Sequence, residues 1–275
     1  MRRRRAGTAA AYGVLGLLAV AFLLPFWVIV RNAFSTQGWI LSPRWNWFPD
    51  AVGPDLLVAM LADANVGLAR SMLNSAVVSV LQTVLTVTIA MMAGYALARN
   101  RTRASGIVHG LTLFTLMVPS TVVFVPTFVM VSSLGWISSY RGLVVPGLFS
   151  AIAVFLFRAW FRGFPVELEE AAELDGASVG RTFVHVVVPN SLGIAGAVGT
   201  ITFIGSWNAF LWPLLIAQDP ALRTVQVTLA QFMTTQGIRY PEVFTGALVA
   251  VTPALVVFLF LQRWLVQGVE QSGLR

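Results

Sequence analysis

Apolar residues in this chain gather in six stretches, and polar or turn-rich segments separate each stretch from the next. The hydrocarbon core of a bilayer is about 30 Å thick, and about 20 helical residues span it. The pattern therefore predicts an all-α membrane protein with a single transmembrane domain over residues 1–275. Its six transmembrane helices are expected at residues 9–30, 73–98, 107–131, 142–157, 191–211 and 243–261.

Composition supports this prediction. Hydrophobic residues make up 57% of the chain and charged residues only 11%, whereas a soluble domain carries about 25% charged residues. The basic start before the first apolar stretch is also typical of a signal peptide. However, this stretch is longer than the usual apolar region of about 7 to 15 residues, so we expect it to remain as the first membrane helix.

The ionisable residues exclude several kinds of site. All 18 basic residues are arginine, so the chain lacks the lysine that a P-loop places on nucleotide phosphates. There is no cysteine, and His109 and His185 lie far apart in the sequence, so no metal site is predicted. We therefore expect this chain to bind no cofactor.

The positions of the arginines predict an orientation, because the cytoplasmic loops of membrane proteins are enriched in basic residues. This also explains the net charge of +7, and no nucleic-acid partner is expected. Both termini and the loop of residues 158–189 are then cytoplasmic. The expected outer arginines are Arg31, Arg44, Arg70, Arg141, Arg223 and Arg239. The expected inner ones are Arg2, Arg3, Arg4, Arg5, Arg99, Arg101, Arg103, Arg158, Arg162, Arg181, Arg263 and Arg275.

The loop of residues 158–189 contains a dense group of acidic residues. Pro165 suits the first turn of a helix, and the acids that follow it are favoured by the positive end of the helix dipole. We expect a helix over residues 165–174 that is ended by Gly176. Glu169 and Glu173 are four residues apart, and this like-charge pair opposes the helix by a few tenths of a kcal/mol. A cationic partner surface would relieve the repulsion.

Two further patterns concern the shape and packing of the spans. Prolines at positions 119, 126, 146 and 253 lie within the predicted spans, where each is expected to interrupt or kink a helix. Small residues recur between Ser191 and Thr200, and such a stripe lets helix backbones approach closely in lipid. The fifth span is therefore expected to pack tightly against another helix or a partner subunit.

The acidic loop also resembles a known signature. Glu170-Ala171-Ala172, followed by Gly176 and then by an apolar segment that reaches Val188-Pro189, resembles the EAA motif of ABC-importer membrane subunits. The longer phrase of residues 161–177 is similar to carbohydrate-uptake permeases of the maltose-transporter type.

Flanking phrases at residues 73–75, 93–99 and 207–213 agree with this family. Two departures concern the substrate and a tail contact: Ala209 stands where the family has a glutamate, and residues 267–275 replace its glycine-lysine tail.

The resemblance implies the ABC type I importer permease fold, with a cytoplasmic coupling helix, in a bacterial inner membrane. That helix would dock on a cytoplasmic ATP-binding subunit, which would hold ATP and Mg²⁺. A second homologous permease subunit would complete the path through the lipid, and an external solute-binding protein would deliver a sugar. The residues that the resemblance assigns to ATPase coupling are Glu169, Glu170, Ala171, Ala172, Asp175, Gly176 and Pro189.

The predicted spans contain no Asp, Glu, Arg or Lys, and His109 is their one histidine. Ion-coupled carriers keep ionisable groups in the membrane, so ATP-driven transport of a neutral sugar or oligosaccharide is favoured. Another solute carried by the same architecture is the alternative, and a secondary carrier or channel is a less favoured one. The candidate residues for the substrate path are Asn74, Gln82, Ser206, Trp207 and Asn208, each of which could instead make a structural hydrogen bond between helices.

Overall fold

The computed structural model describes residues 2–51, 53–63, 66–234 and 237–272. The chain forms two compact units: unit 1 contains Met1–Ala69 and Val225–Thr252, and unit 2 contains Arg70–Thr224 and Pro253–Arg275. We describe each unit by itself. Arg275 lies outside the described residues, as do the side chains of Arg2–Arg5 and Arg263.

Unit 1 is held together around the end of its long first helix. Gln37 donates from Nε2 to the Ile238 carbonyl and accepts at Oε1 from the Tyr240 amide, both at 3.0 Å. The Thr245 hydroxyl donates to the Ala33 carbonyl at 3.0 Å. Its elements are α1 (Arg2–Ala33), α2 (Gln37–Ile40), α3 (Asp55–Ala62), α14 (Val225–Ala230), the antiparallel strands β1 (Met233–Thr234) and β2 (Gly237–Ile238), and the start of α15 (Tyr240–Ser272).

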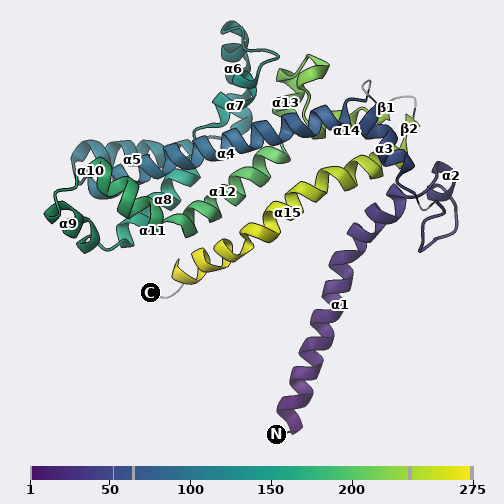
Figure 1. Ribbon diagram of the computed structural model, residues 1–275, viewed down its shortest axis with the longest axis horizontal. Coiled ribbons are helices and arrows are strands. Elements are labelled where there is room, and N and C mark those ends of the chain that lie inside the picture. Colours follow the sequence, from purple (N-terminus) through teal and green to yellow (C-terminus); the bar gives the residue numbers. More distant parts are fainter. Residues whose placement is uncertain (1, 52, 64–65, 235–236, 273–275) are drawn as a thin grey trace. The chain divides into compact units, whose positions relative to one another are not determined.

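Unit 2 contains nearly all of α4 (Leu68–Arg99) and a series of shorter helices (Figure 1). These are α5 (Arg103–Thr115), α6 (Ser120–Ser133), α7 (Tyr140–Val144), η1 (Val145–Gly147), α8 (Ala151–Gly163), α9 (Glu167–Leu174), α10 (Val179–Thr182), η2 (Phe183–Val187), α11 (Val188–Asn190), α12 (Leu192–Trp207), α13 (Leu211–Ile216) and η3 (Pro220–Leu222).

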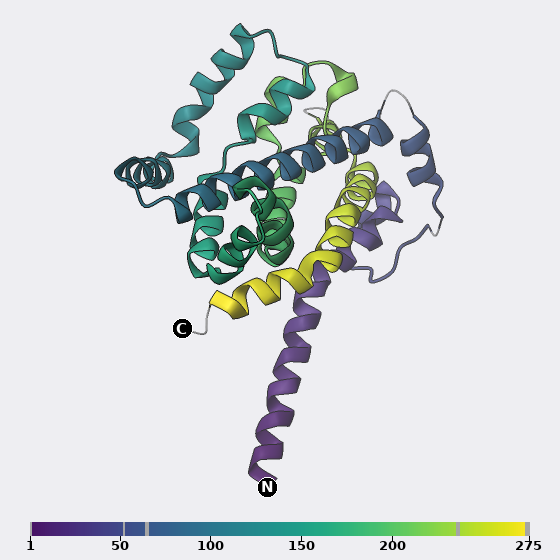
Figure 2. The ribbon, with the colours of Figure 1, turned by 60° about the vertical axis from the view of Figure 1, so that its left-hand side comes forward.

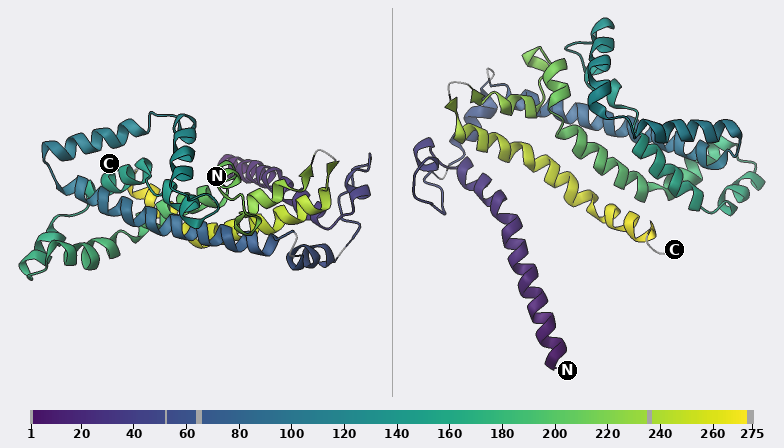
Figure 3. Two further views of the ribbon diagram at one scale, coloured as in Figure 1. Left: turned by 90° about the horizontal axis from the view of Figure 1, so that it is seen from above. Right: turned by 180° about the vertical axis from the view of Figure 1, so that it is seen from behind.

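Three helices in the described part are long and apolar enough to cross a membrane, within Ala11–Ala33, Leu68–Arg99 and Tyr240–Phe260. Three more candidate spans are bent pairs of helices. The first pair, Arg103–Thr115 and Ser120–Ser133, turns through 100°, so that α6 stands away from α5 (Figures 2 and 3). The other pairs are Tyr140–Gly147 with Ala151–Gly163 (46°) and Val179–Asn190 with Leu192–Trp207 (75°). When each bent pair is counted as one span, the described part of the chain has six candidate spans.

Two of the four prolines singled out in the sequence lie at these bends. Pro119 is the N-cap of α6, and Pro146 lies in η1, between α7 and α8. Proline disfavours helical geometry at the preceding residue and lacks the amide that would continue the ladder. In contrast, Pro126 and Pro253 lie inside continuous helices, α6 and α15.

The core of unit 2 forms where α4 crosses α8. A Cβ added to Gly94 would lie 2.6 Å from the Phe157 Cβ and 2.8 Å from the Arg158 amide nitrogen, so only glycine allows this approach. Phe157 and Phe161 are fully buried beneath the crossing. Residues of α12 and η2, including Val198 and Val187, complete this cluster. The packing fixes the end of α4 beside the acidic loop.

Candidate functional site

The acidic loop folds into a short helix whose C-terminus is set by glycine. The described helix α9 begins at Glu167, two residues later than expected, with Val166 as its N-cap. Gly176 has φ +79°, and its amide donates to the Glu173 carbonyl while the Ala177 amide donates to the Ala172 carbonyl, both at 2.9 Å. This is a Schellman motif, which requires the left-handed conformation that glycine adopts without strain. The prediction that Gly176 ends the helix is confirmed.

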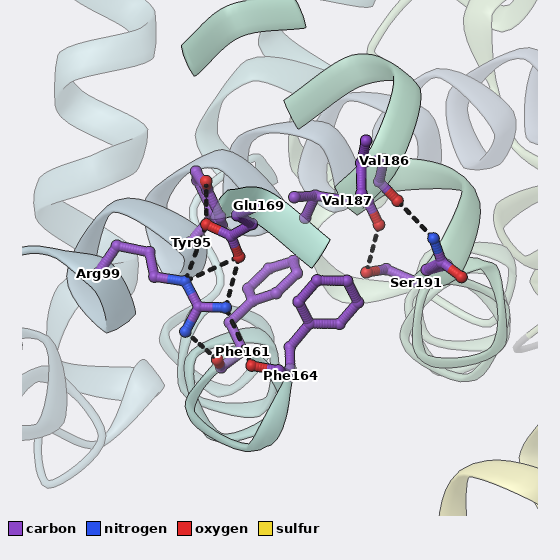
Figure 4. A network of polar contacts seen from close by, with 9 residues as sticks. Tyr95, Arg99, Phe161, Phe164, Glu169, Val186, Val187 and Ser191 are labelled. Carbon is purple, nitrogen blue, oxygen red and sulfur yellow. Dashed lines mark hydrogen bonds and ion pairs between the residues drawn. The ribbon is translucent and has the colours of Figure 1, made fainter. Parts of the chain in front are cut away.

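One acid of this helix, Glu169, points back into the protein. Arg99, the last residue of α4, donates from Nε to both carboxylate oxygens of Glu169, at 2.9 and 3.1 Å, and Tyr95 donates to Oε2 at 2.8 Å (Figure 4). Only 13% of the Glu169 side chain and 24% of the Arg99 side chain are exposed. A bidentate arrangement of this kind is among the stronger ionic contacts in proteins.

Arg99 also connects this helix to α8. Its Nη1 donates to the Phe161 carbonyl at 2.8 Å, and its Nη2 donates to the Phe164 carbonyl at 3.1 Å. These carbonyls belong to the last turn of α8 and the residue after it, where helix carbonyls lack partners and a cation is favourable. We call this set, Tyr95, Arg99 and Glu169 with the two carbonyls, the α9 clasp. It joins α4, α8 and α9.

Sequence reasoning missed Tyr95 and Arg99 as members of this site. Their spacing of four residues puts both on one face of a helix, which is the signal that was available. Sequence reasoning also placed Glu169 among the residues that face an ATPase. In the structure, its carboxylate instead accepts hydrogen bonds from Tyr95 and Arg99 of the same chain.

The other acids of the loop face outward. Glu170, Glu173 and Asp175 are exposed, and none of them makes a hydrogen bond or an ion pair within the described residues. Leu174 is 90% exposed between them. Ala171 is exposed and Ala172 partly buried, so the surface beside Glu170 is flat.

Pro189 lies at the junction between the loop and α12. It follows the π-helical turn η2 and precedes the 75° bend. Proline removes one backbone donor, and side chains bond the nearby carbonyls: Asn190 donates to the Val186 carbonyl and Ser191 to the Val187 carbonyl, both at 2.7 Å (Figure 4). The segment Val179–Asn190 thus separates α9 from α12.

A second feature of unit 2 is a cavity of about 300 Å³ among α4, α6, η1 and the end of α12. Gln82 accepts at Oε1 from the Ser206 hydroxyl at 2.7 Å and donates from Nε2 to the Gly147 carbonyl at 3.1 Å. Ser120, Thr127, Phe124 and Trp212 also line the cavity, and sequence reasoning had not selected them. Its described lining is uncharged, with hydroxyl, amide and aromatic groups.

The other three substrate-path candidates lie elsewhere. Asn74 is fully buried, donates to the Ala221 and Arg223 carbonyls at 2.9 Å, and accepts from the Tyr140 hydroxyl at 2.7 Å. Trp207 is 2% exposed and stacks on Phe203. Asn208 is exposed but is not part of the cavity lining. Asn74 and Trp207 therefore act as packing and hydrogen-bonding residues of the fold.

Comparison with known proteins identifies the chain's relatives. Residues 86–271 match the family described as binding-protein-dependent transport system inner membrane component. The chain is 30% identical to the lactose transport system permease protein LacG of Rhizobium radiobacter, over 98% of this chain and 97% of that protein. It is 36% identical to the sn-glycerol-3-phosphate transport system permease protein UgpE of Yersinia pestis, over 94% of each.

A third relative is the arabinooligosaccharides transport system permease protein AraQ of Bacillus subtilis, 32% identical over 74% of this chain and 72% of that protein. A solved structure, of a bacterial ABC transporter involved in the import of the acidic polysaccharide alginate, has the same fold. It matches with a TM-score of 0.82 at 20% identity, over 96% of this chain and 98% of that chain. The chain belongs to the binding-protein-dependent transport system inner membrane component family, and it is a membrane permease subunit of an ABC importer rather than an enzyme.

Proposed function

We propose that this permease pairs with a second, homologous permease and imports a sugar or oligosaccharide, driven by cytoplasmic ATP-binding subunits that dock on α9. The observation that carries the docking proposal is the outward face of α9. It combines Leu174, 90% exposed, with the carboxylates of Glu170, Glu173 and Asp175, which have no partner within the described residues. We call this the α9 face.

Lipid does not suit the α9 face, because carboxylates are costly in hydrocarbon. If the α9 face met only water, Leu174 would have no apolar contact. The like charges of Glu170 and Glu173, at neighbouring helical positions, would have no cation beside them. A cleft with basic and apolar groups on a partner protein satisfies both. The α9 clasp supports this proposal, since it holds the short helix against α4 and α8 while Glu170, Glu173 and Asp175 stay exposed.

The composition indicates that ATP is bound by other subunits. With no lysine in the chain, a P-loop for ATP and Mg²⁺ belongs to the partner subunits. An external solute-binding protein delivers the substrate. Both termini and α9 lie on the cytoplasmic side in this proposal.

For the coupling step, closure of the ATP-binding subunits moves α9 as a rigid handle. The motion passes along two routes. One is the α9 clasp, which reaches the ends of α4 and α8 directly. The other is Val179–Asn190, which leads through the 75° bend to α12 and its small-residue stripe. Of these helices, α4 and α12 line the uncharged cavity, at Gln82 and Ser206.

The cavity favours a neutral, hydroxyl-rich substrate. Its amide and hydroxyl groups suit sugar hydroxyls, Phe124 and Trp212 offer apolar ring faces, and no described lining residue carries a charge. The relatives include permeases named for lactose and arabinooligosaccharides, but also one named for sn-glycerol-3-phosphate. We propose the neutral class for this chain.

The docking proposal is tested with the variants Leu174→Asp and Glu170→Arg, measured by co-purification of the ATP-binding subunits and by uptake into vesicles. Each should lower ATPase association by about tenfold or more, because a mismatched charge in an interface costs about 2 kcal/mol or more. Leu41→Asp, the same change at an exposed leucine of the predicted external loop, is the control and should assemble normally. Normal assembly and uptake with both α9 variants would contradict the proposal. Uptake of an anionic substrate in place of any neutral sugar would overturn only the substrate class.

A further inference from the structure

A basic cavity of about 580 Å³ lies at the turn that joins α4 to α5, beside the end of α8 in unit 2. Its lining is polar and contains no acidic residue. We call it the arginine pocket, and its described lining residues are Leu97, Ala98, Arg99, Asn100, Arg101, Thr102, Ser105, Gly106, Arg158 and Arg162.

The charge of the arginine pocket is not balanced within the described residues. Arg99 is paired with Glu169, but Arg101, Arg158 and Arg162 have no acidic partner there. Arg158 and Arg162 are four residues apart on α8, so their charges repel each other. Arg158 Nη1 lies 3.0 Å from His109 Nε2, and Arg158 Nε donates to the Leu97 carbonyl at 3.4 Å. Neither contact brings a negative charge to Arg158. An anion would satisfy these guanidinium groups.

The surface next to the arginine pocket is apolar and exposed. On α5, Ile107, Val108 and Leu111 are 64%, 51% and 60% exposed, and Ile107 directly follows the lining residue Gly106. On α8, Phe155 is 42% exposed one turn before Arg158. Exposed apolar side chains of a membrane protein are suited to contact with acyl chains. The pocket thus lies close to exposed apolar side chains, along which the tails of a lipid would run if its headgroup occupied the pocket.

We propose that the arginine pocket binds the phosphate of an anionic membrane lipid, with the acyl chains lying along α5 and α8. Guanidinium groups bind phosphate oxygens through paired, charge-assisted hydrogen bonds. Basic pockets between membrane helices are a recurrent form of anionic-lipid site. A free phosphate offers the same headgroup chemistry, but it leaves the apolar walls unused. Because Arg99 belongs both to this pocket and to the α9 clasp, a bound lipid lies next to the contact that holds α9.

The experiment uses the full chain, purified in a zwitterionic detergent and titrated with phosphatidylglycerol, with bound lipid counted by native mass spectrometry. The test variant is Arg101→Gln with Arg162→Gln. Both side chains are exposed and neither makes a hydrogen bond within the described residues, so the variant should fold. We expect the affinity for phosphatidylglycerol to fall about fivefold per arginine removed. Phosphatidylcholine should bind weakly both to the unaltered chain and to the double variant.

Arg103→Gln is the matched control, because Arg103 lies on the same turn and carries the same charge but does not line the pocket. It should leave the affinity unchanged. An equal loss in the control would show a diffuse attraction to the surface and overturn the proposal. Inorganic phosphate alone binding as tightly as the lipid would also overturn it, as would displacement of the lipid when the ATP-binding subunits assemble, since the pocket would then belong to a protein interface.

Discussion

Arg99 directs its guanidinium group to three parts of the chain: the Glu169 carboxylate and the carbonyls of Phe161 and Phe164. If the carboxylate is removed, this partly buried guanidinium group loses the negative charge that balances it and keeps only its hydrogen bonds to the two carbonyls. Glu169 therefore has a structural role distinct from that of Glu170, its neighbour in the sequence, which has no partner within the described residues.

This difference makes a residue-scale prediction. Glu169→Ala should destabilise the detergent-solubilised chain by about 2 kcal/mol, because it leaves the Arg99 charge unpaired, and Tyr95→Phe should cost about 1 kcal/mol for one hydrogen bond. Thermal unfolding of the single variants and of Glu169→Ala with Arg99→Met measures the coupling between the two side chains. Glu173→Ala, at an exposed acid of the same helix, should unfold like the unaltered chain. Additive effects of the Glu169 and Arg99 changes would refute the clasp.

At the scale of elements, the least regular backbone of unit 2 lies between α9 and α12. Here a π-helical turn, Pro189 and a 75° bend follow one another within about ten residues. π-helical turns are rare and are frequent at functional sites. The side chains of Asn190 and Ser191 stabilise the break by bonding the carbonyls of Val186 and Val187.

We predict that Ser191→Ala weakens this break. Ser191 is fully buried, so the Val187 carbonyl would lose a bond of 2.7 Å at a cost of about 1 kcal/mol. Amide hydrogen exchange of residues 185–195 should become faster by about fivefold. Thr202→Ala provides the control, because the Thr202 hydroxyl bonds the Val198 carbonyl in the middle of α12, where the backbone ladder is intact. Equal acceleration in both variants would show that the proline break has no special dependence on side chains.

Much of this organisation could be predicted from the sequence. The six apolar stretches, the acidic helix and the glycine that ends it all follow from local patterns that a chain carries residue by residue. The bends do not, because Pro119 and Pro126 look alike in the sequence but only Pro119 lies at a break. Tertiary packing decides which proline ends a helix. The inward direction of Glu169 was missed for the same reason, since it depends on where Arg99 lies in the fold.

Orientation in the membrane is a property of the whole molecule, and the chain is well suited to measuring it because it has no native cysteine. The distribution of arginine predicts that the acidic loop is cytoplasmic and that the segment after α13 is external. Ser178→Cys and Gln218→Cys place one thiol at an exposed position in each segment. In intact cells a membrane-impermeant maleimide should label the Gln218 variant but not the Ser178 variant, and both should react once the membrane is dissolved. Labelling of the Ser178 variant in intact cells would reverse the orientation and place the α9 face outside, where cytoplasmic ATP-binding subunits could not reach it.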